Sequence, residues 1–193
     1  MKSKIEAKFP GQDFPTYRTE KIYIMDYTNQ TENVRGIKWS DSAPTDIEAF
    51  CINNSQPALD ITFCAFKENT IKLSGETKER THCEGVLFPA EDSRKTWIVF
   101  LELKYPKRKN LGPELKEARE QLLDTLELFR GQGIIEEKRL VHLIFSAPKY
   151  VNQTPFESWS MQPSELKNIR KTKHAIIRGV NSMDVISSES IKL

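Results

Sequence analysis

Residues 96–104, with the sequence TWIVFLELK, constrain the fold of this chain more than any other segment. The segment is rich in β-branched and aromatic residues, and its odd and even positions are both largely apolar. Such a strand must be covered on both faces, so we expect it to lie inside a sheet. Glu102 and Lys104 end this strand on one face, and a buried charge requires a partner or a metal ion.

The segments around this strand alternate between strand and helix patterns. Apolar residues recur at helical spacing between Pro113 and Gly131, which predicts an amphipathic helix of about 17 residues. Strands are expected at 21–27, at about 59–65, at 83–88, at 139–147 and in short pieces over 174–193. A further basic helix is expected at 164–173.

Two other segments carry weaker patterns. Thr45 and Glu48 have the spacing of a capping box, which predicts a short helix through about residue 53. Residues 1–19 are polar and contain two prolines, so we expect an irregular N-terminal arm. Together the segments predict an α/β fold with a mixed central β-sheet flanked by helices.

Length and composition indicate one domain. The chain has 193 residues and a net charge of +2, and a domain typically has about 100–200 residues, so residues 1–193 are expected to fold together. No apolar run approaches the roughly 18 residues of a membrane span, and the first residues lack a hydrophobic signal region. Three cysteines do not suggest a disulfide framework. These features favour a cytoplasmic protein that does not enter membranes.

The E-x-K string at Glu102 is informative only by its context, because the same string occurs six times in the chain. The occurrence at 102–104 alone ends a long apolar strand.

If strands 83–88 and 97–104 pair about a turn near Ser93, facing residues have numbers that sum to 186. Glu84 then faces Glu102 at a Cβ separation of about 4.5–5.5 Å. Two carboxylates at that distance repel unless a cation lies between them, and their oxygens suit Mg²⁺ or Mn²⁺. Asp92, in the turn, is the rival second acid.

The residues HCEGVLF, a turn and TWIVFLELKYPK together resemble the PD-(D/E)XK nuclease superfamily. The resemblance covers about residues 45–147. It implies a restriction-endonuclease-like core, in which a helix precedes a three-strand meander, a second helix and a further strand; here extra strands would follow at the termini. It also implies Mg²⁺-dependent hydrolysis of phosphodiester bonds by an endonuclease or exonuclease. We favour DNA over RNA as the substrate, although the sequence does not distinguish the two.

The same resemblance assigns roles to residues of this chain. Glu84 takes the place of the second-strand acid, which is usually Asp, and Glu102 and Lys104 take the places of the motif's acid and lysine. The carbonyl of Leu103 would be a further metal ligand, and Gln121 is similar to the glutamine often found on the following helix. A first-helix acid would be Glu48 or Glu68, and the sequence leaves both open.

Basic residues follow the motif directly. Lys107, Arg108 and Lys109 would hold a phosphate backbone beside the metal site, although a solvated loop explains them equally well. Tyr105 and Trp159 are aromatic residues able to stack on bases. Many nucleases cut the two strands of a duplex as dimers, so a homodimer is one assembly compatible with this function. The alternative function is a non-catalytic module that binds nucleic acid or protein on the same fold.

Overall fold

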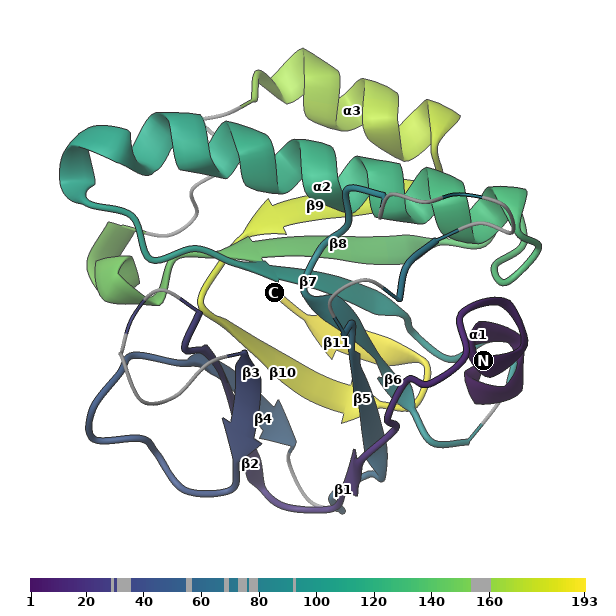
Figure 1. Ribbon diagram of the computed structural model, residues 1–193, viewed down its shortest axis with the longest axis horizontal. Helices are drawn as coiled ribbons and strands as arrows, with labels where there is room; N and C mark the ends of the chain where they lie inside the picture. The colour runs from purple at the N-terminus through teal and green to yellow at the C-terminus, as the bar shows by residue number, and fades with distance from the viewer. Residues whose placement is uncertain are drawn as a thin grey trace.

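The computed structural model describes residues 1–28, 30, 36–54, 57–67, 70–72, 76, 80–91, 93–153 and 161–193. Within these residues the strands form two mixed sheets (Figure 1). The first sheet has the order β1 (Thr16–Tyr17), β5 (Ile61–Ala65), β6 (Gly85–Pro89), β7 (Val99–Leu103), β8 (Val141–Ser146) and β9 (Ala175–Gly179). The second has the order β11 (Ser190–Lys192), β10 (Ser182–Ser187), β4 (Phe50–Asn54), β2 (Lys21–Asp26) and β3 (Ile37–Ser40).

The helices form a third layer on the first sheet. They are α1 (Lys2–Lys8), α2 (Leu111–Gly131) and α3 (Pro163–Thr172), with short 3-10 turns at η1 (Arg108–Asn110) and η2 (Pro148–Gln153). In Figure 1, α2 and α3 cross above strands β7, β8 and β9 of the first sheet, whereas β1, β5 and β6 run down the view beside the second sheet. Among the described residues, no helix is long and apolar enough to cross a membrane.

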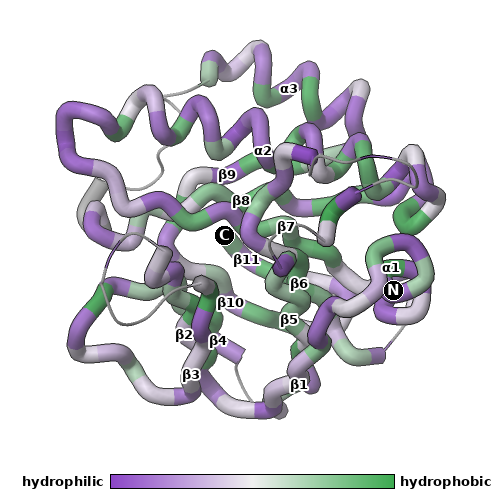
Figure 2. Tube along the Cα trace, viewed as in Figure 1, coloured by the Kyte–Doolittle hydropathy of each residue, from purple (hydrophilic) through white to green (hydrophobic). Residues whose placement is uncertain are grey.

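Two apolar cores hold the three layers together. One joins α1, α2 and α3 to the first sheet, and the other lies between the two sheets. Strand β7 contributes to both, because Phe100 faces the helices while Val99 and Leu101 face the second sheet. Figure 2 shows the hydrophobic colour gathered along the strands of the first sheet. All five residues of β7 are buried, which confirms the predicted interior strand covered on both faces.

Three expectations about the fold are wrong. The second sheet was not expected, because the sequence pattern suggested one central sheet. The predicted helix at 45–53 is absent: residues 45–47 are bends, residues 48 and 49 are irregular, and β4 follows. Phe50 and Ile52, two residues apart, both point into the core between the sheets. The alternation of buried side chains along a strand therefore outweighs the capping-box pattern. The arm at residues 1–19 contains α1 and β1. Its residues Ile5 and Phe9, one helical turn apart, are both fully buried.

Gly85 begins β6 at a point that leaves no room for a side chain. A Cβ there would lie 2.4 Å from the carbonyl oxygen of Cys64 and 2.7 Å from the Phe63 ring. Gly85→Ala must displace β6 from β5, and we expect it to lower the free energy of unfolding by about 3 kcal/mol in urea denaturation. Gly131→Ala is the control, because its added Cβ meets nothing within 4 Å. Equal urea midpoints for the two variants would contradict this prediction.

Candidate active site

The hairpin of β6 and β7 has the register expected from the sequence. The pairs are Gly85–Leu101, Val86–Phe100 and Leu87–Val99, and each pair of numbers sums to 186. The next pair in this register is Glu84 and Glu102, directly before β6 and near the end of β7. The Glu84 N–H donates to Oε2 of Glu102 at 3.0 Å, so the two residues meet at this end of the hairpin.

Glu84 is held in place by neighbours on three elements. Its carbonyl accepts a hydrogen bond of 2.9 Å from the Phe66 N–H, directly after β5. The preceding residue, Cys83, donates its N–H to Thr125 Oγ1 of α2 at 2.8 Å. Strand β7 contributes the Glu102 carboxylate. The backbone at Glu84 is therefore fixed between β5, β7 and α2, although Glu84 lies outside regular secondary structure.

Glu102 and Lys104 form an ion pair on the helix-facing side of β7. Glu102 is fully buried, and its Oε1 lies 3.0 Å from Nζ of Lys104. The same ammonium lies 3.6 Å from Oε1 of Glu117 on α2. Apart from this ion pair, Oε1 of Glu102 has no hydrogen-bond partner among the described residues. A buried carboxylate with so few partners is costly, which makes this end of β7 a candidate functional site.

The carboxyl groups are less acidic than isolated ones. Burial raises the pKa of Glu102 to about 7, although Lys104 opposes the rise. Burial, then Glu102 and then Asp26 raise the pKa of Glu84 well above its usual range. Burial lowers the pKa of Lys104, but Glu102 and its other acidic neighbours more than offset this, so the pKa is raised. Lys104 therefore keeps its proton, and the two acids repel each other in a poorly hydrated site.

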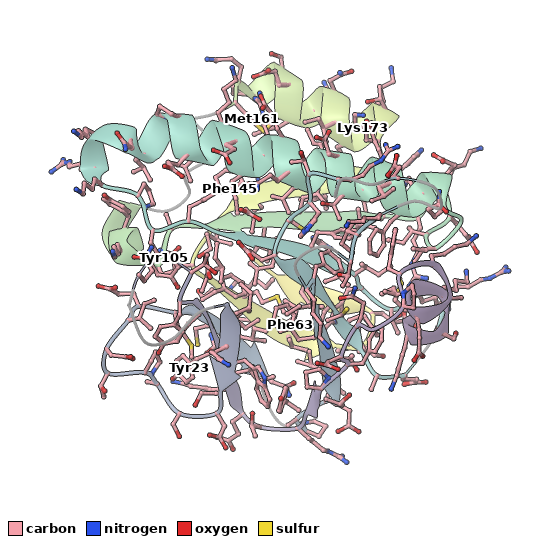
Figure 3. The ribbon with its side chains drawn as sticks, in the orientation of Figure 1. Tyr23, Phe63, Tyr105, Phe145, Met161 and Lys173 are labelled. Atoms are coloured by element: carbon pink, nitrogen blue, oxygen red, sulfur yellow. The ribbon has the colours of Figure 1, made fainter. Side chains whose placement is uncertain are left out.

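Asp26 is an acid of this region that the sequence analysis missed. It ends β2 of the second sheet and is buried, and its charge acts on both Glu84 and Glu102. The Asp26 N–H donates to the hydroxyl of Tyr105 at 3.4 Å, and that hydroxyl donates to the Glu48 carbonyl at 2.8 Å. Figure 3 shows Tyr105 on the left of the view. The only sequence signal was an acid ending an otherwise apolar strand.

The candidates for a first-helix acid and the turn acid have different outcomes. Glu48 is exposed and lies in the irregular segment before β4, so the helix expected to carry it does not exist. The hydrogen bond to Tyr105 uses its backbone carbonyl. Glu68, Asp92 and the aromatic Trp159 lie outside the described residues.

A cavity of about 890 Å³ opens beside Glu84. Glu84 and Gln121 line it together, so the structure brings the predicted second-strand acid and helix glutamine to one space. Oε1 of Gln121 is buried and has no hydrogen-bond partner within the described part of the chain. His82 lines the same cavity and contacts the Cys83 carbonyl through Nδ1 at 2.8 Å.

The other predicted residues lie around the end of β7. The last β6–β7 pair is Gly85–Leu101, and Leu103 pairs with Ser146 of β8 on the other side. Lys107, Arg108 and Lys109 are exposed in the turn before α2. They follow Lys104 closely along the chain, but they are not among the described residues that line the cavity.

The donor atoms at this site are carboxylate oxygens. In the parts of the chain that the structure describes, no group of three or more His, Cys, Asp or Glu side chains is arranged to hold a metal ion. Mg²⁺ often binds through one or two carboxylates, with waters and a substrate phosphate as its other ligands. Glu84 and Glu102 could be those carboxylates, because both are buried and, apart from its ion pair with Lys104, Oε1 of Glu102 has no hydrogen-bond partner among the described residues.

Comparison with known proteins found no match: no family model matches the chain, and no curated protein or solved structure matches it significantly.

Proposed function

We propose that this chain is a divalent-metal-dependent nuclease that hydrolyses phosphodiester bonds, in DNA rather than RNA. The observation that carries the proposal is the meeting of Glu84, directly before β6, with Glu102 on β7, with the Lys104 ammonium 3.0 Å from Glu102. The chain order also supports it. Strands β5, β6 and β7 form an antiparallel meander, α2 follows, and β8 returns parallel to β7. The resemblance to PD-(D/E)XK nucleases implies this order.

Each side chain has a role in the proposed reaction. A Mg²⁺ or Mn²⁺ ion held by Glu84, Glu102 and the Leu103 carbonyl would polarise the phosphate and lower the pKa of a bound water. Lys104 carries its proton, so it acts as a cation that stabilises negative charge on the phosphate oxygens and not as a general base. Gln121 presents its amide to the cavity and binds the substrate there.

The basic turn would hold the rest of the strand. Lys107, Arg108 and Lys109 are exposed and follow the site directly, where they would contact backbone phosphates. Such contacts position a nucleic acid without reading its sequence.

The direct test is cleavage of end-labelled DNA and RNA, single-stranded and duplex, by the full chain with Mg²⁺, with Mn²⁺ or with EDTA. We expect DNA to be cut in the presence of either metal and to remain intact in EDTA. Intact DNA and RNA under all of these conditions would overturn the proposal.

A non-catalytic binding module is the second candidate. It is favoured by the pairing of Glu102 with Lys104 and by the lack of a three-acid group among the described residues. This function predicts nucleic-acid binding that is unchanged by EDTA and by Glu102→Gln, without cleavage in any metal.

Metal binding can be measured without any substrate. An ion present at ten times its dissociation constant stabilises the folded state by about 1.4 kcal/mol, so we expect Mn²⁺ at pH 8 to raise the unfolding temperature by about 3–5 °C. Glu84→Gln should abolish this shift because it removes one ligand. Glu117→Gln should retain it, since Glu117 is an exposed acid that also approaches Lys104. A shift that survives in Glu84→Gln would place the ion elsewhere.

A further inference from the structure

The cavity beside Glu84 has an aromatic wall. Trp39 of β3, Phe63 of β5, Phe66 and His82 all line it. They come from both sheets and from the segment that leads into β6. Its volume of about 890 Å³ lies within the range of about 300–1,000 Å³ that small-molecule sites occupy. Flat aromatic groups around a space of this size suit a planar, uncharged ring system such as a nucleobase.

The polar groups of the cavity also suit a base. Oε1 of Gln121 is buried without a hydrogen-bond partner in the described residues, and the side chain lines the cavity. A side-chain amide offers one acceptor and two donors, and glutamine pairs with base edges in this way. A base in the cavity would satisfy a polar group that has no partner in the described part of the chain.

Two cationic side chains line the same cavity and remain accessible. Lys67 is 47% exposed and pairs with Asp13 at 2.8 Å, and Arg80 is 49% exposed and pairs with Glu76. Exposed ion pairs contribute little to stability, so a phosphate can replace the carboxylate in either pair. The cavity therefore offers cations for a phosphate as well as an aromatic wall and an amide for a base.

We propose that this cavity binds the base of one unpaired nucleotide, so that the protein acts on single strands or frayed strand ends. A base within a duplex is stacked and paired, and neither its face nor its pairing edge is free to enter a pocket. The inference rests on the proposed nuclease function, because Glu84 belongs both to the cavity and to the acidic pair with Glu102. A base held in the cavity puts its own phosphodiester beside those acids.

The test measures binding in EDTA, where no cleavage is expected. The probes are a single-stranded DNA oligonucleotide carrying one 2-aminopurine, whose fluorescence is quenched by stacking, and its fully paired duplex. We expect the single strand to bind at least about 10-fold more tightly than the duplex, with quenching. Trp39→Ala and Gln121→Leu should each weaken single-strand binding about 10-fold and reduce the preference for the single strand over the duplex. Tyr23→Ala is the control, because Tyr23 is a half-buried aromatic residue of the neighbouring strand β2 that lines a separate pocket.

Equal affinities for the two probes, or full single-strand affinity in Gln121→Leu, would overturn the inference. Circular dichroism identifies any variant that fails to fold. If Trp39→Ala fails to fold, the result with Gln121→Leu decides the test. The two proposals fail separately. Metal-dependent cleavage without single-strand preference overturns only the role of the cavity, whereas single-strand preference without cleavage in any metal overturns the nuclease.

Discussion

Glu102→Gln is expected to reduce metal-dependent DNA cleavage by at least about 10²–10³-fold, the effect typical of losing one electrostatic contact to the reacting groups. The substitution keeps the shape of the side chain, and its amide oxygen can still accept the Glu84 N–H at 3.0 Å. It removes the charge that would bind the metal. Single-turnover rates with end-labelled DNA measure the effect, and binding in EDTA should change little.

Two companion variants sharpen that result. Lys104→Met removes the ammonium beside Glu102 and should lower the cleavage rate by a similar factor. Glu117→Gln removes an exposed carboxylate 3.6 Å from the same ammonium and should leave the rate within about threefold. A wild-type cleavage rate in Glu102→Gln would show that the Glu102 carboxylate is not required for catalysis.

The sequence predicted the hairpin of the site because its determinants are local. Residues of a strand alternate between two faces, and a turn centred near Ser93 determines which residues face each other. These two rules suffice to place Glu84 opposite Glu102, and the pairs from Gly85–Leu101 to Leu87–Val99 agree.

The parts of the site that were missed come from segments distant in sequence. Asp26 and Trp39 lie on strands of the second sheet, and only tertiary packing brings them near Glu84. A strand pattern shows that β2 exists but not which sheet it joins. The failed capping box at Thr45 has a similar cause, because β4 gains more from burial between the sheets than a short helix gains from its cap.

The metal-free protein is expected to lose stability as the pH rises from about 4.5 to about 7. The pKa of Glu102 rises on folding from 4.5 to about 7 because its carboxyl group is buried. Between those values the folded state binds more protons than the unfolded state, so the free energy of unfolding falls with pH and levels off above 7. A rise of this size corresponds to on the order of 3 kcal/mol.

The comparison of wild type with Glu102→Gln isolates this effect, because glutamine does not titrate. Urea unfolding of both proteins in EDTA between pH 5 and 8 should show the variant gaining stability relative to wild type as the pH rises. Lys104 does not contribute to this trend, since its acidic neighbours raise its pKa and it keeps its proton throughout this range. Parallel stability curves would mean that Glu102 is ionised throughout, with its charge already compensated by Lys104. Added Mn²⁺ should restore stability to the wild type at pH 8, because an ion between Glu84 and Glu102 compensates the charge of two carboxylates whose pKa values burial raises.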